Sequence, residues 1–582
     1  MKKLKSKNDI ERPWIKFYKE GVKPNLIYSK SSMVGYFLEA VSKYPESIAY
    51  EFYGYKCTYR ELYEKIRNAA KALKAQGVKE NDKVTICMPN TPSAIIMFYA
   101  TNMVGAIASM VHPLSAEKEI ETYLNESEST LLFVLDMVYE KVRNIIDTTK
   151  VKKVVVGSVG DNLKTLKKIV YKYNSRGKVP NIELNDNIMT YKEFLNYGYD
   201  YDGEVNALRK ATDPAVILYS GGTSGDPKGI LLSNLNFNAL ALQSHKMVEQ
   251  TAPGKSVLSI LPIFHGFGLG VCIHTPLCCG MKVILVPDFS PKKFRKTLLE
   301  KQPNFVCGVP SLFESLIKDG KVKKNKLSFL EAVISGGDFM SESLKEKVDD
   351  FLRESGSNAE VRVGYGLTES SAATCLTPTN RYKNGSIGIP FPDMYYKIVK
   401  IGTHDTVPYN EEGEICISGP TVMMGYINNP EETLQTLRKH DDGKLWLHTG
   451  DIGTMDEEGY VYYTQRLKRI IVSNGYNLYP SHIENVINSY PDVLTSTVIG
   501  IAHPYKVQVA KAFIVLNDGV KPTKELLKKI KKHCEIHLSK YSLPSEYEFR
   551  ESLPKTLVGK VAYKKLEKES QDNVKEKKDE KI

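Results

Sequence analysis

The sequence has little of what would suggest a secreted, disulfide-linked or zinc-cysteine protein. Its nine cysteines are an odd number and include no Cys-x-x-Cys pair, so neither a disulfide framework nor a cysteine zinc site is indicated. The first seven residues are mostly basic, but no apolar stretch follows them, which excludes a signal peptide. Most of the cysteines lie in apolar runs. We therefore expect reduced core residues in a cytoplasmic protein.

Long uncharged segments are also scarce. Residues 94–111 form one that is long enough to raise the question of a membrane span. Asn102 and Gly105 lie inside it, and Pro92 and His112 flank it. This arrangement favours a helix that runs into a strand within a folded core. The chain also lacks internal repeats, and its only low-complexity segment is the charged tail.

Acidic residues are too few to balance the basic ones, and the formal net charge is +12. This excess suits anionic ligands such as ATP and CoA, or weak peripheral contact with an anionic membrane. Nucleic acid is a less suitable partner, because acids are interleaved with the basic residues throughout. Residues 564–582 carry seven lysines and six acids. We expect a charged, frayed tail from about residue 566.

Short apolar runs alternate with amphipathic segments, a pattern that predicts doubly wound α/β sheets. Residues 164–203 are polar and irregular, and residues 385–426 are rich in β-type residues. Because 582 residues are too many for one core, we expect a nucleotide- and acyl-binding domain over residues 1–466 and a mobile α+β domain over residues 467–582. The expected strands are 84–87, 130–135, 154–156, 303–307, 332–335, 493–501 and 510–516, and the expected helices are 117–126, 138–149, 310–318 and 524–538.

A loop rich in glycine and hydroxyl groups follows the apolar run at residues 215–218. Its glycines let consecutive backbone N–H groups turn toward an anion, while its hydroxyls and final lysine add further donors. It is not a Walker A loop, because Pro227 precedes Lys228 and Gly229 follows it. A flexible surface loop is the alternative. The candidate phosphate-binding residues are Ser220, Gly221, Gly222, Thr223, Ser224, Gly225 and Lys228.

This loop resembles the signature of the adenylate-forming superfamily, which includes acyl- and aryl-CoA synthetases, carrier-protein adenylation domains and firefly-type luciferases. Four further motifs resemble those of the superfamily and occur in its order. They are Tyr365-Gly-Leu-Thr-Glu369, Thr449-Gly-Asp451, Arg466-Leu-Lys-Arg-Ile-Ile-Val-Ser-Asn-Gly475 and Pro554-Lys-Thr-Leu-Val-Gly-Lys560. The resemblance covers nearly the whole chain and is greatest to medium- and long-chain fatty acyl-CoA synthetases. It implies a large domain of two doubly wound α/β subdomains and a β-barrel, followed by a small mobile domain.

The resemblance implies a role for each motif. Thr368 would hydrogen-bond the α-phosphate and Glu369 would hold Mg²⁺, which prefers carboxylate and phosphate oxygens; a helix start with an acid in its first turn is the alternative for this pair. Lys560 would stabilise the transition state between the substrate carboxylate and the α-phosphate, although such a lysine is usually a surface charge. The residues implied in AMP binding are Gly336, Gly337, Asp338, Tyr365, Gly366, Asp451 and Arg466, with Tyr365 on adenine and Asp451 on the ribose hydroxyls.

Further residues are assigned by the same resemblance. His265 would gate the acyl channel, although a core histidine fits its surroundings equally well. The acyl pocket would be lined by Phe264, Val309, Gly337 and Gly364, the hinge between half-reactions would be Lys468, and Gly475 would border the CoA channel.

The implied activity is that of an AMP-forming acyl-CoA synthetase that acts on medium- or long-chain fatty acids with ATP, Mg²⁺ and CoA. The alternatives are transfer of an acyl or aryl group to a carrier protein, a luciferase-like oxygenase, and an inactive homologue that serves as a binding module. Complete motifs speak against the last alternative. A homodimer is compatible with the sequence, and no motif encodes the acyl chain length.

Overall fold

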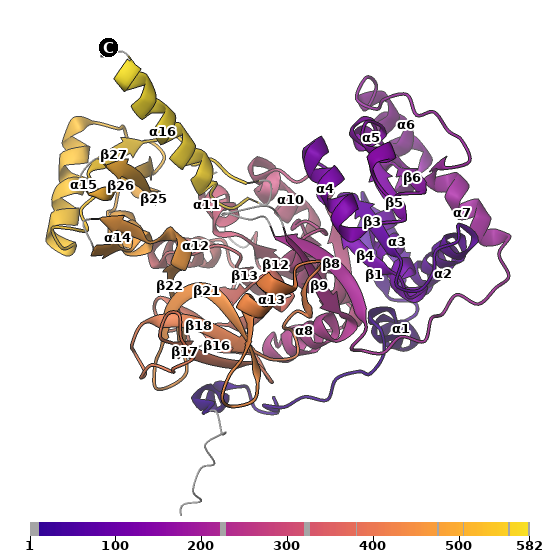
Figure 1. Cartoon of the computed structure of the whole chain (residues 1–582), viewed down its shortest axis with the longest axis horizontal. Helices are drawn as coiled ribbons and strands as arrows, with labels where there is room; N and C mark the ends of the chain where they lie inside the picture. Colours follow the sequence, from indigo (N-terminus) through magenta and orange to yellow (C-terminus); the bar gives the residue numbers. More distant parts are fainter. Residues whose placement is uncertain are drawn as a thin grey trace, which may run out of the picture.

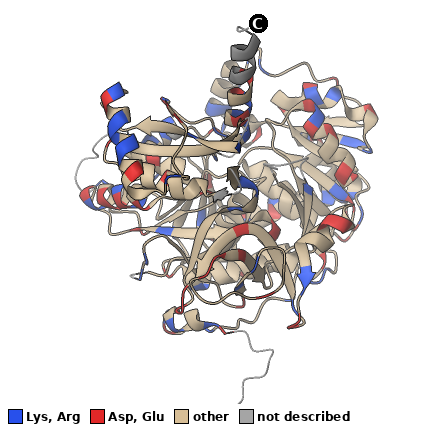
Figure 2. Ribbon diagram, turned by 60° about the vertical axis from the view of Figure 1, so that its left-hand side comes forward, with Lys and Arg blue, Asp and Glu red and all other residues tan. Residues whose placement is uncertain are grey.

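The structure is a computed structural model that describes residues 11–579 apart from 221–227, 319–325, 380, 474–475, 504–505 and 557–558. Figure 1 shows a large body and, beside it, a smaller one formed by the segment that follows Arg466. Basic and acidic residues are interspersed along most of the ribbon (Figure 2). Within the described ranges, no helix is long and apolar enough to cross a bilayer.

Eight strands form the first sheet of the large body, and six of them run parallel to one another. The expected strands at residues 84–87, 130–135 and 154–156 are confirmed in its centre. The order of the sheet is β19 (Gly425–Tyr426), β9 (Lys228–Ser233), β8 (Pro214–Ser220), β4 (Ile107–Met110), β3 (Lys83–Cys87), β5 (Leu131–Leu135), β6 (Lys153–Gly157) and β7 (Ile188–Thr190).

Helix α3 (Pro92–Met103) accounts for the uncharged segment at residues 94–111. Thr91 caps the helix by accepting a hydrogen bond from the backbone N–H of Ala94, and Pro92 occupies its first position, where no N–H is needed. Every residue of α3 is buried, so apolar side chains face protein on all sides. Strand β4 begins shortly after Gly105. The expected helix running into a strand is confirmed.

Two expectations for this region are wrong. The helix expected over residues 138–149 is only α5 (Tyr139–Arg143), with short 3-10 turns beside it. The stretch 164–203, expected to be irregular, contains α6 (Thr165–Asn174), β7 and α7 (Tyr191–Tyr199). Helix α7 starts at a capping box between Thr190 and Glu193 and buries Tyr191, Phe194 and Gly198 at helical spacing. The expected helix 117–126 is confirmed as α4 (Glu117–Ser127).

The second sheet of the large body has fourteen strands, parallel in one part and antiparallel in the other. The parallel strands are β1 (Ile48–Phe52), β11 (Lys282–Leu285), β10 (Ser256–Ser259), β12 (Phe305–Gly308), β13 (Ala332–Ser335) and β14 (Val361–Gly366), with β2 (Tyr55–Thr58) antiparallel at the edge. The antiparallel strands are β15 (Ala373–Leu376), β16 (Ser386–Pro390), β17 (Tyr395–Val399), β18 (Gly413–Ser418), β20 (Leu437–Lys439), β21 (Leu445–Met455) and β22 (Val461–Arg466). Strand β14 joins the two parts, because it pairs in parallel with β13 and antiparallel with β15.

Helices separate the strands of the large body, as expected for a doubly wound fold. The helix expected at residues 310–318 is confirmed as α11 (Pro310–Lys318). The other helices are α1 (Met33–Lys43), α2 (Tyr59–Ala75), α8 (Asn234–Met247), α9 (Thr275–Cys278), α10 (Phe294–Lys301), α12 (Glu342–Glu354) and α13 (Pro430–Thr436), together with a π-helix at Phe267–His274.

The segment after Arg466 forms a separate five-stranded sheet with its own buried clusters. The expected strand pair is confirmed, because β25 (Val493–His503) and β26 (Val507–Leu516) are antiparallel neighbours. The remaining elements are β23 (Ile471–Ser473), β24 (Tyr476–Leu478), β27 (Glu546–Phe549), α14 (Pro480–Asn488) and α15 (Lys524–His537). Residue 566, where the charged tail is expected to begin, lies within α16 (Tyr563–Asp579), and Leu566 is fully buried against this sheet.

Candidate functional site

The candidate site lies at the carboxyl end of β14, and a glycine is required at this end of the strand. A Cβ on Gly366 would lie 1.5 Å from the carbonyl oxygen of Ala372, so no larger residue fits this turn into β15. The turn places Tyr365 opposite β21. Its hydroxyl donates a hydrogen bond of 2.7 Å to Oδ2 of Asp451, and burial raises the pKa of the phenol. Two residues of separate motifs are therefore in direct contact.

Asp451 is buried beside a cation. It is only 1% exposed, and it pairs in register with Arg466 across the β21–β22 hairpin. The Nε of Arg466 lies 3.2 Å from Oδ1 of Asp451, yet that oxygen accepts no hydrogen bond from any described residue. Burial raises the pKa of Asp451 although Arg466 opposes the rise, and Asp451 in turn raises the pKa of Arg466. A buried acceptor is thus available to ligand hydroxyls.

Thr368 and Glu369 lie on a 3-10 turn, Thr368–Ser370, that leads into β15. No α-helix follows them, so the alternative of a helix start does not apply to this pair. The side chain of Glu369 accepts a hydrogen bond of 3.1 Å from the hydroxyl of Tyr426, and its backbone oxygen accepts one of 2.8 Å from the N–H of Met423. These bonds hold the carboxylate at the edge of β19.

Lys560 reaches this group from the other body of the protein. Its Cε lies 3.7 Å from the position that a Cβ would take at Gly337. Burial lowers the pKa of Lys560, while the nearby carboxylates of Asp338, Asp451 and Glu369 raise it and Arg466 lowers it. The lysine therefore lies among charged residues that belong to three other motifs.

The turn around Lys560 is fastened to the large body. Ser311 donates a hydrogen bond of 3.0 Å to the carbonyl oxygen of Gly559, and the N–H of Val561 lies 3.4 Å from Oδ2 of Asp338. Within the turn, the N–H of Thr556 donates to the carbonyl of Lys560 at 2.7 Å. The carboxylate of Asp338 therefore contacts the turn that carries Lys560.

Gly336 and Gly337 follow β13 and leave room for Lys560 to approach. The N–H of Gly336 donates to the carbonyl of Gly308 at 3.0 Å. Gly337 has a φ of +81°, a conformation that favours glycine. Because neither residue has a side chain, a space remains beside them. Lys560 and the ring of Phe267 lie at the border of this space.

Two of the residues expected at the acyl pocket, Val309 and Gly337, lie beside the turn that carries Lys560. Val309 is 3.4 Å from the position of a Cβ on Gly559, and Gly364 faces Leu376 at the same distance. The ring of Phe264 packs against His112, with centroids 4.1 Å apart. Nδ1 of His265 accepts a hydrogen bond of 3.2 Å from the N–H of Phe267, and burial, followed by the charge of Lys560, lowers the pKa of His265 to about 3. This imidazole is neutral near pH 7.

The ends of the phosphate loop are described, but its centre is not. Ser220 closes β8 and pairs in register with Lys228 at the start of β9. The ammonium of Lys228 forms an ion pair with Glu432 and lies over the ring of Tyr426 at 5.3 Å. Gly221, Gly222, Thr223, Ser224 and Gly225 lie outside the described residues.

Tyr426 contacts two of the expected site residues, although no sequence pattern indicates it. Its hydroxyl binds Glu369, and its ring lies under Lys228. It therefore connects the expected metal ligand with the expected phosphate ligand. The three residues are far apart in the chain, and Tyr426 belongs to none of the five motifs, so no local pattern indicates the contact.

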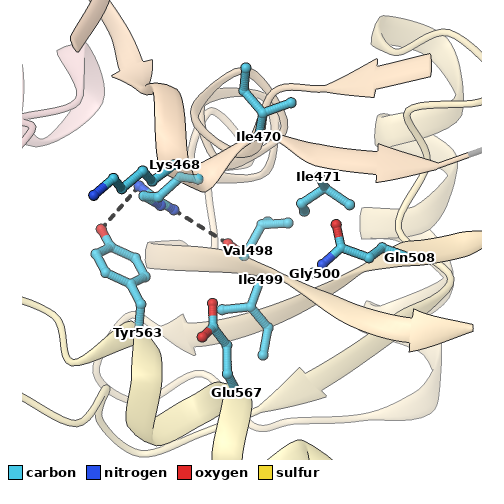
Figure 3. Close-up of a pocket in the computed structure, with 10 residues that line it drawn as sticks. Lys468, Ile470, Ile471, Val498, Ile499, Gly500, Gln508, Tyr563 and Glu567 are labelled. Atoms are coloured by element: carbon cyan, nitrogen blue, oxygen red, sulfur yellow. Dashed lines mark hydrogen bonds between the residues drawn. The ribbon is translucent and has the colours of Figure 1, made fainter. Parts of the chain in front are cut away.

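Lys468 lies on a 3-10 turn, Leu467–Arg469, directly after β22. Its neighbour Arg469 binds Glu484 at 2.7 Å. It also donates hydrogen bonds to the hydroxyl of Tyr563 at 3.2 Å and to the carbonyl of Val498 at 3.3 Å, which are the two dashed lines in Figure 3. The guanidinium also lies 3.9 Å above the ring of Tyr563. The chain thus enters the small body through a well-bonded turn. Gly475 lies outside the described residues.

Comparisons with known proteins agree with this arrangement. The AMP-binding enzyme family matches residues 37–427, and the AMP-binding enzyme C-terminal domain matches residues 482–560. A long-chain-fatty-acid–CoA ligase of Bacillus subtilis is 30% identical over 97% of this chain and 99% of its own length. A luciferin 4-monooxygenase of Luciola mingrelica is 28% identical over 87% of this chain and 88% of its own. Among solved structures, the ATP-bound RpMatB-BxBclM chimera B1 has a TM-score of 0.81 at 24% identity, over 94% of this chain and 99% of the other.

Proposed function

Because the chain belongs to the AMP-binding enzyme family, we propose that it joins a medium- or long-chain fatty acid to CoA with conversion of ATP to AMP and pyrophosphate. The observation that carries this proposal is the position of Lys560, whose turn lies against Gly337 and Asp338, in the same molecule as the buried ion pair of Arg466 with Asp451. Such a site can hold a nucleotide and also neutralise a second anion that approaches its phosphates.

The residues present fit ATP. Oδ1 of Asp451, which is ion-paired with Arg466 but accepts no hydrogen bond within the described residues, is placed to accept one from a ribose hydroxyl, and Tyr365 holds the other carboxylate oxygen. Glu369 offers a carboxylate for Mg²⁺, which usually takes its remaining ligands from phosphate oxygens and water. When bound, this ion neutralises phosphate charge.

In the first half-reaction, an oxygen of the substrate carboxylate attacks the α-phosphorus, and the bond to pyrophosphate breaks. The two reactants are both anions, so the chain must supply positive charge where they meet. Lys560 does this from the turn that Ser311 and Asp338 hold. In the second half-reaction the CoA thiol attacks the acyl carbon, AMP leaves, and the thiol proton passes to solvent. The small body turns about Lys468 between the two steps.

The acyl group lies among the apolar residues near Lys560. Val309 and Phe264 supply apolar surface, while Gly337 and Gly364 leave room beside them. Similarity to the Bacillus subtilis ligase supports a fatty acid. An apolar channel should improve binding by up to about 0.8 kcal/mol for each methylene that it buries.

A panel of acids from acetate to stearate, with benzoate, tests this function by release of AMP with and without CoA. We expect CoA-dependent AMP release with a maximum at medium or long chains. A preference for acetate or benzoate would overturn the fatty-acid assignment. Consumption of oxygen in place of CoA would identify a luciferase-like reaction, and turnover only with an acyl carrier protein would replace CoA as the acceptor.

A further inference from the structure

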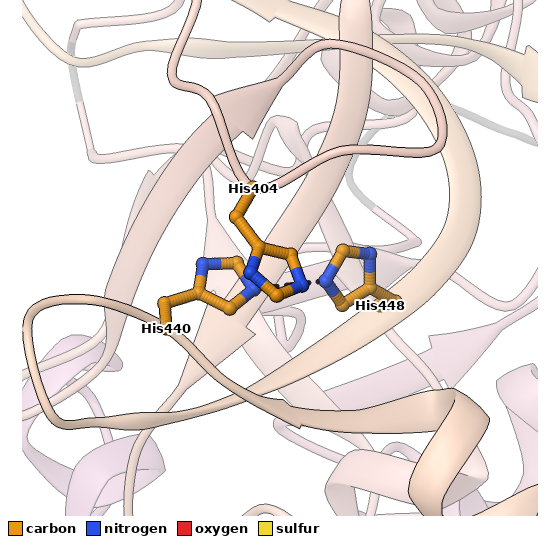
Figure 4. A group of neighbouring side chains, drawn as sticks. All are labelled: His404, His440 and His448. Atoms are coloured by element: carbon orange, nitrogen blue, oxygen red, sulfur yellow. Dashed lines mark hydrogen bonds between the residues drawn. The ribbon is translucent and has the colours of Figure 1, made fainter.

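Three histidines gather in the antiparallel part of the second sheet, apart from the residues that face Lys560. His404 lies in the loop between β17 and β18, His440 between β20 and β21, and His448 within β21. One ring nitrogen from each lies within 4.8 Å of the others. Figure 4 shows the three rings grouped together. His440 and His448 are buried, and His404 is exposed, so one side of the group is open to solvent.

The two buried histidines face each other through nitrogens that are both suited to a metal ion. Nε2 of His440 lies 2.9 Å from Nε2 of His448 (Figure 4). Two nitrogens bound to one tetrahedral Zn²⁺ at about 2.0–2.1 Å each stand about 3.3 Å apart. A rotation of either ring by a small angle therefore gives the spacing that one ion requires.

A carboxylate holds His448 in the orientation typical of metal-bound histidine. Nδ1 of His448 lies 2.8 Å from Oε2 of Glu414. Since a carboxylate accepts and the ring donates, Nδ1 carries the proton and Nε2 presents its lone pair to His440. Nδ1 of His440 has no hydrogen-bond partner among the described residues. It is free to take the proton and leave Nε2 of His440 as a second lone pair.

We propose that His404, His440 and His448 bind a divalent transition-metal ion, Zn²⁺ by preference, with a water molecule as fourth ligand. Neutral imidazole suits zinc, whereas Mg²⁺ requires hard oxygen ligands. The stacked ring of His404, with its centroid 4.1 Å from that of His440, turns on its exposed loop to add the third nitrogen. This ion is distinct from the Mg²⁺ that accompanies ATP.

The proposed zinc site is connected with the nucleotide-binding residues. The second oxygen of Glu414 accepts a hydrogen bond of 3.0 Å from the N–H of Gly450. Gly450 precedes Asp451 and has a φ of +66°. An ion on His448 therefore fixes Glu414, and Glu414 fixes the turn that carries Asp451.

Zinc binding to the EDTA-treated full-length protein, measured by calorimetry, tests the proposal. We expect one tight Zn²⁺ per chain, and a visible absorption spectrum of tetrahedral type when Co²⁺ is used in its place. His404→Ala should weaken zinc binding at least tenfold without unfolding the protein, because this side chain is exposed. Glu414→Gln should weaken it by about 10–100-fold through loss of the oriented carboxylate.

His537→Ala is the matched control. The rings of His537 and His533 on α15 lie 4.3 Å apart and form another candidate pair for a metal ion. We expect His537→Ala to bind zinc like the wild type. The proposal is overturned if the wild type binds no zinc, if His404→Ala binds it with unchanged affinity, or if His537→Ala loses it. Each of the last two outcomes would place the ion elsewhere.

Discussion

The hydroxyl of Tyr365 donates a hydrogen bond of 2.7 Å to Oδ2 of Asp451. The two residues belong to motifs that are far apart in the chain, and each was expected to contact a different part of AMP. Their contact means that the aromatic ring and the ribose acceptor are positioned together. A change at Tyr365 should consequently alter ribose binding as well as adenine stacking.

Tyr365→Phe keeps the ring and removes only the hydroxyl. Because hydrogen bonds to a charged group contribute about 1.5–3 kcal/mol, the KM for ATP in pyrophosphate exchange should rise about tenfold or more. Tyr462→Phe is the control, since its hydroxyl binds Asp456 at 3.2 Å outside the site. An unchanged KM in Tyr365→Phe would mean that the bond does not orient Asp451 for ATP.

Lys560→Ala removes the cation at the meeting point of two anions. We expect adenylate formation to fall by at least about a thousandfold, a loss typical of a group that stabilises developing charge. Conversion of supplied acyl-AMP with CoA should fall far less. The exposed Lys564 provides the control variant Lys564→Ala. Equal losses in both half-reactions would contradict the assignment of Lys560 to adenylation.

Glu369→Gln replaces a carboxylate with an amide of the same shape. Mg²⁺ binds the amide poorly, so activity at limiting magnesium should fall and be partly restored at higher magnesium. The exposed Glu354 on α12 gives the control Glu354→Gln. A normal magnesium dependence in Glu369→Gln would leave this carboxylate with the structural contact to Tyr426 alone.

Lys468→Pro tests the hinge. The residue lies on a 3-10 turn, and proline fixes φ near −65°, within the range of such turns. The variant should therefore keep the orientation described here and lose the freedom to leave it. Pyrophosphate exchange should stay near normal while thioester formation is lost. Lys468→Ala and a melting curve serve as controls. A folded Lys468→Pro that completes both half-reactions would place the pivot elsewhere.

The buried His274 makes stability depend on pH. Burial lowers its pKa from 6.5 to about 3. Below about pH 6.5 the unfolded chain therefore binds a proton at His274 that the folded chain does not bind. The contribution of neutral His274 to the free energy of unfolding is complete above pH 6.5. It falls by about 1.4 kcal/mol per pH unit as the pH is lowered toward 3. The pH dependence of urea unfolding should be shallower in His274→Gln. An identical slope in the two proteins would show that His274 does not supply it.

Apolar strands and sequence motifs made much of the fold and site predictable. The expected strand at residues 332–335 is β13, and the motifs singled out Gly337 and Tyr365 at the ends of β13 and β14. Contacts between distant segments were not predictable, because Tyr426 and Glu432 carry no motif. The three histidines were missed for the same reason: a loop, a turn and a strand bring them together.

Polar helices were also missed. In α16, Leu566 is fully buried, while charged residues make up most of the sequence of the helix, so composition alone does not indicate this helix. Helix α6 carries Leu166, Ile169 and Val170 at the i, i+3 and i+4 spacing of a helix and exposes all three, so its periodicity was available in the sequence although its apolar face is not buried.

The contact between Arg469 and Tyr563 has a mechanical consequence. Arg469 follows the proposed pivot, Lys468, by one residue, and Tyr563 follows Lys560 by three. The guanidinium of Arg469 nevertheless lies 3.9 Å from the centre of the Tyr563 ring. The two ends of the small body are thereby braced against each other. If the small body turns about Lys468 as proposed, Arg469 and Tyr563 would move together, and the position of Lys560 would follow the angle of the hinge. Tyr563→Ala would loosen that brace and make the position of the charge less dependent on the angle of the hinge.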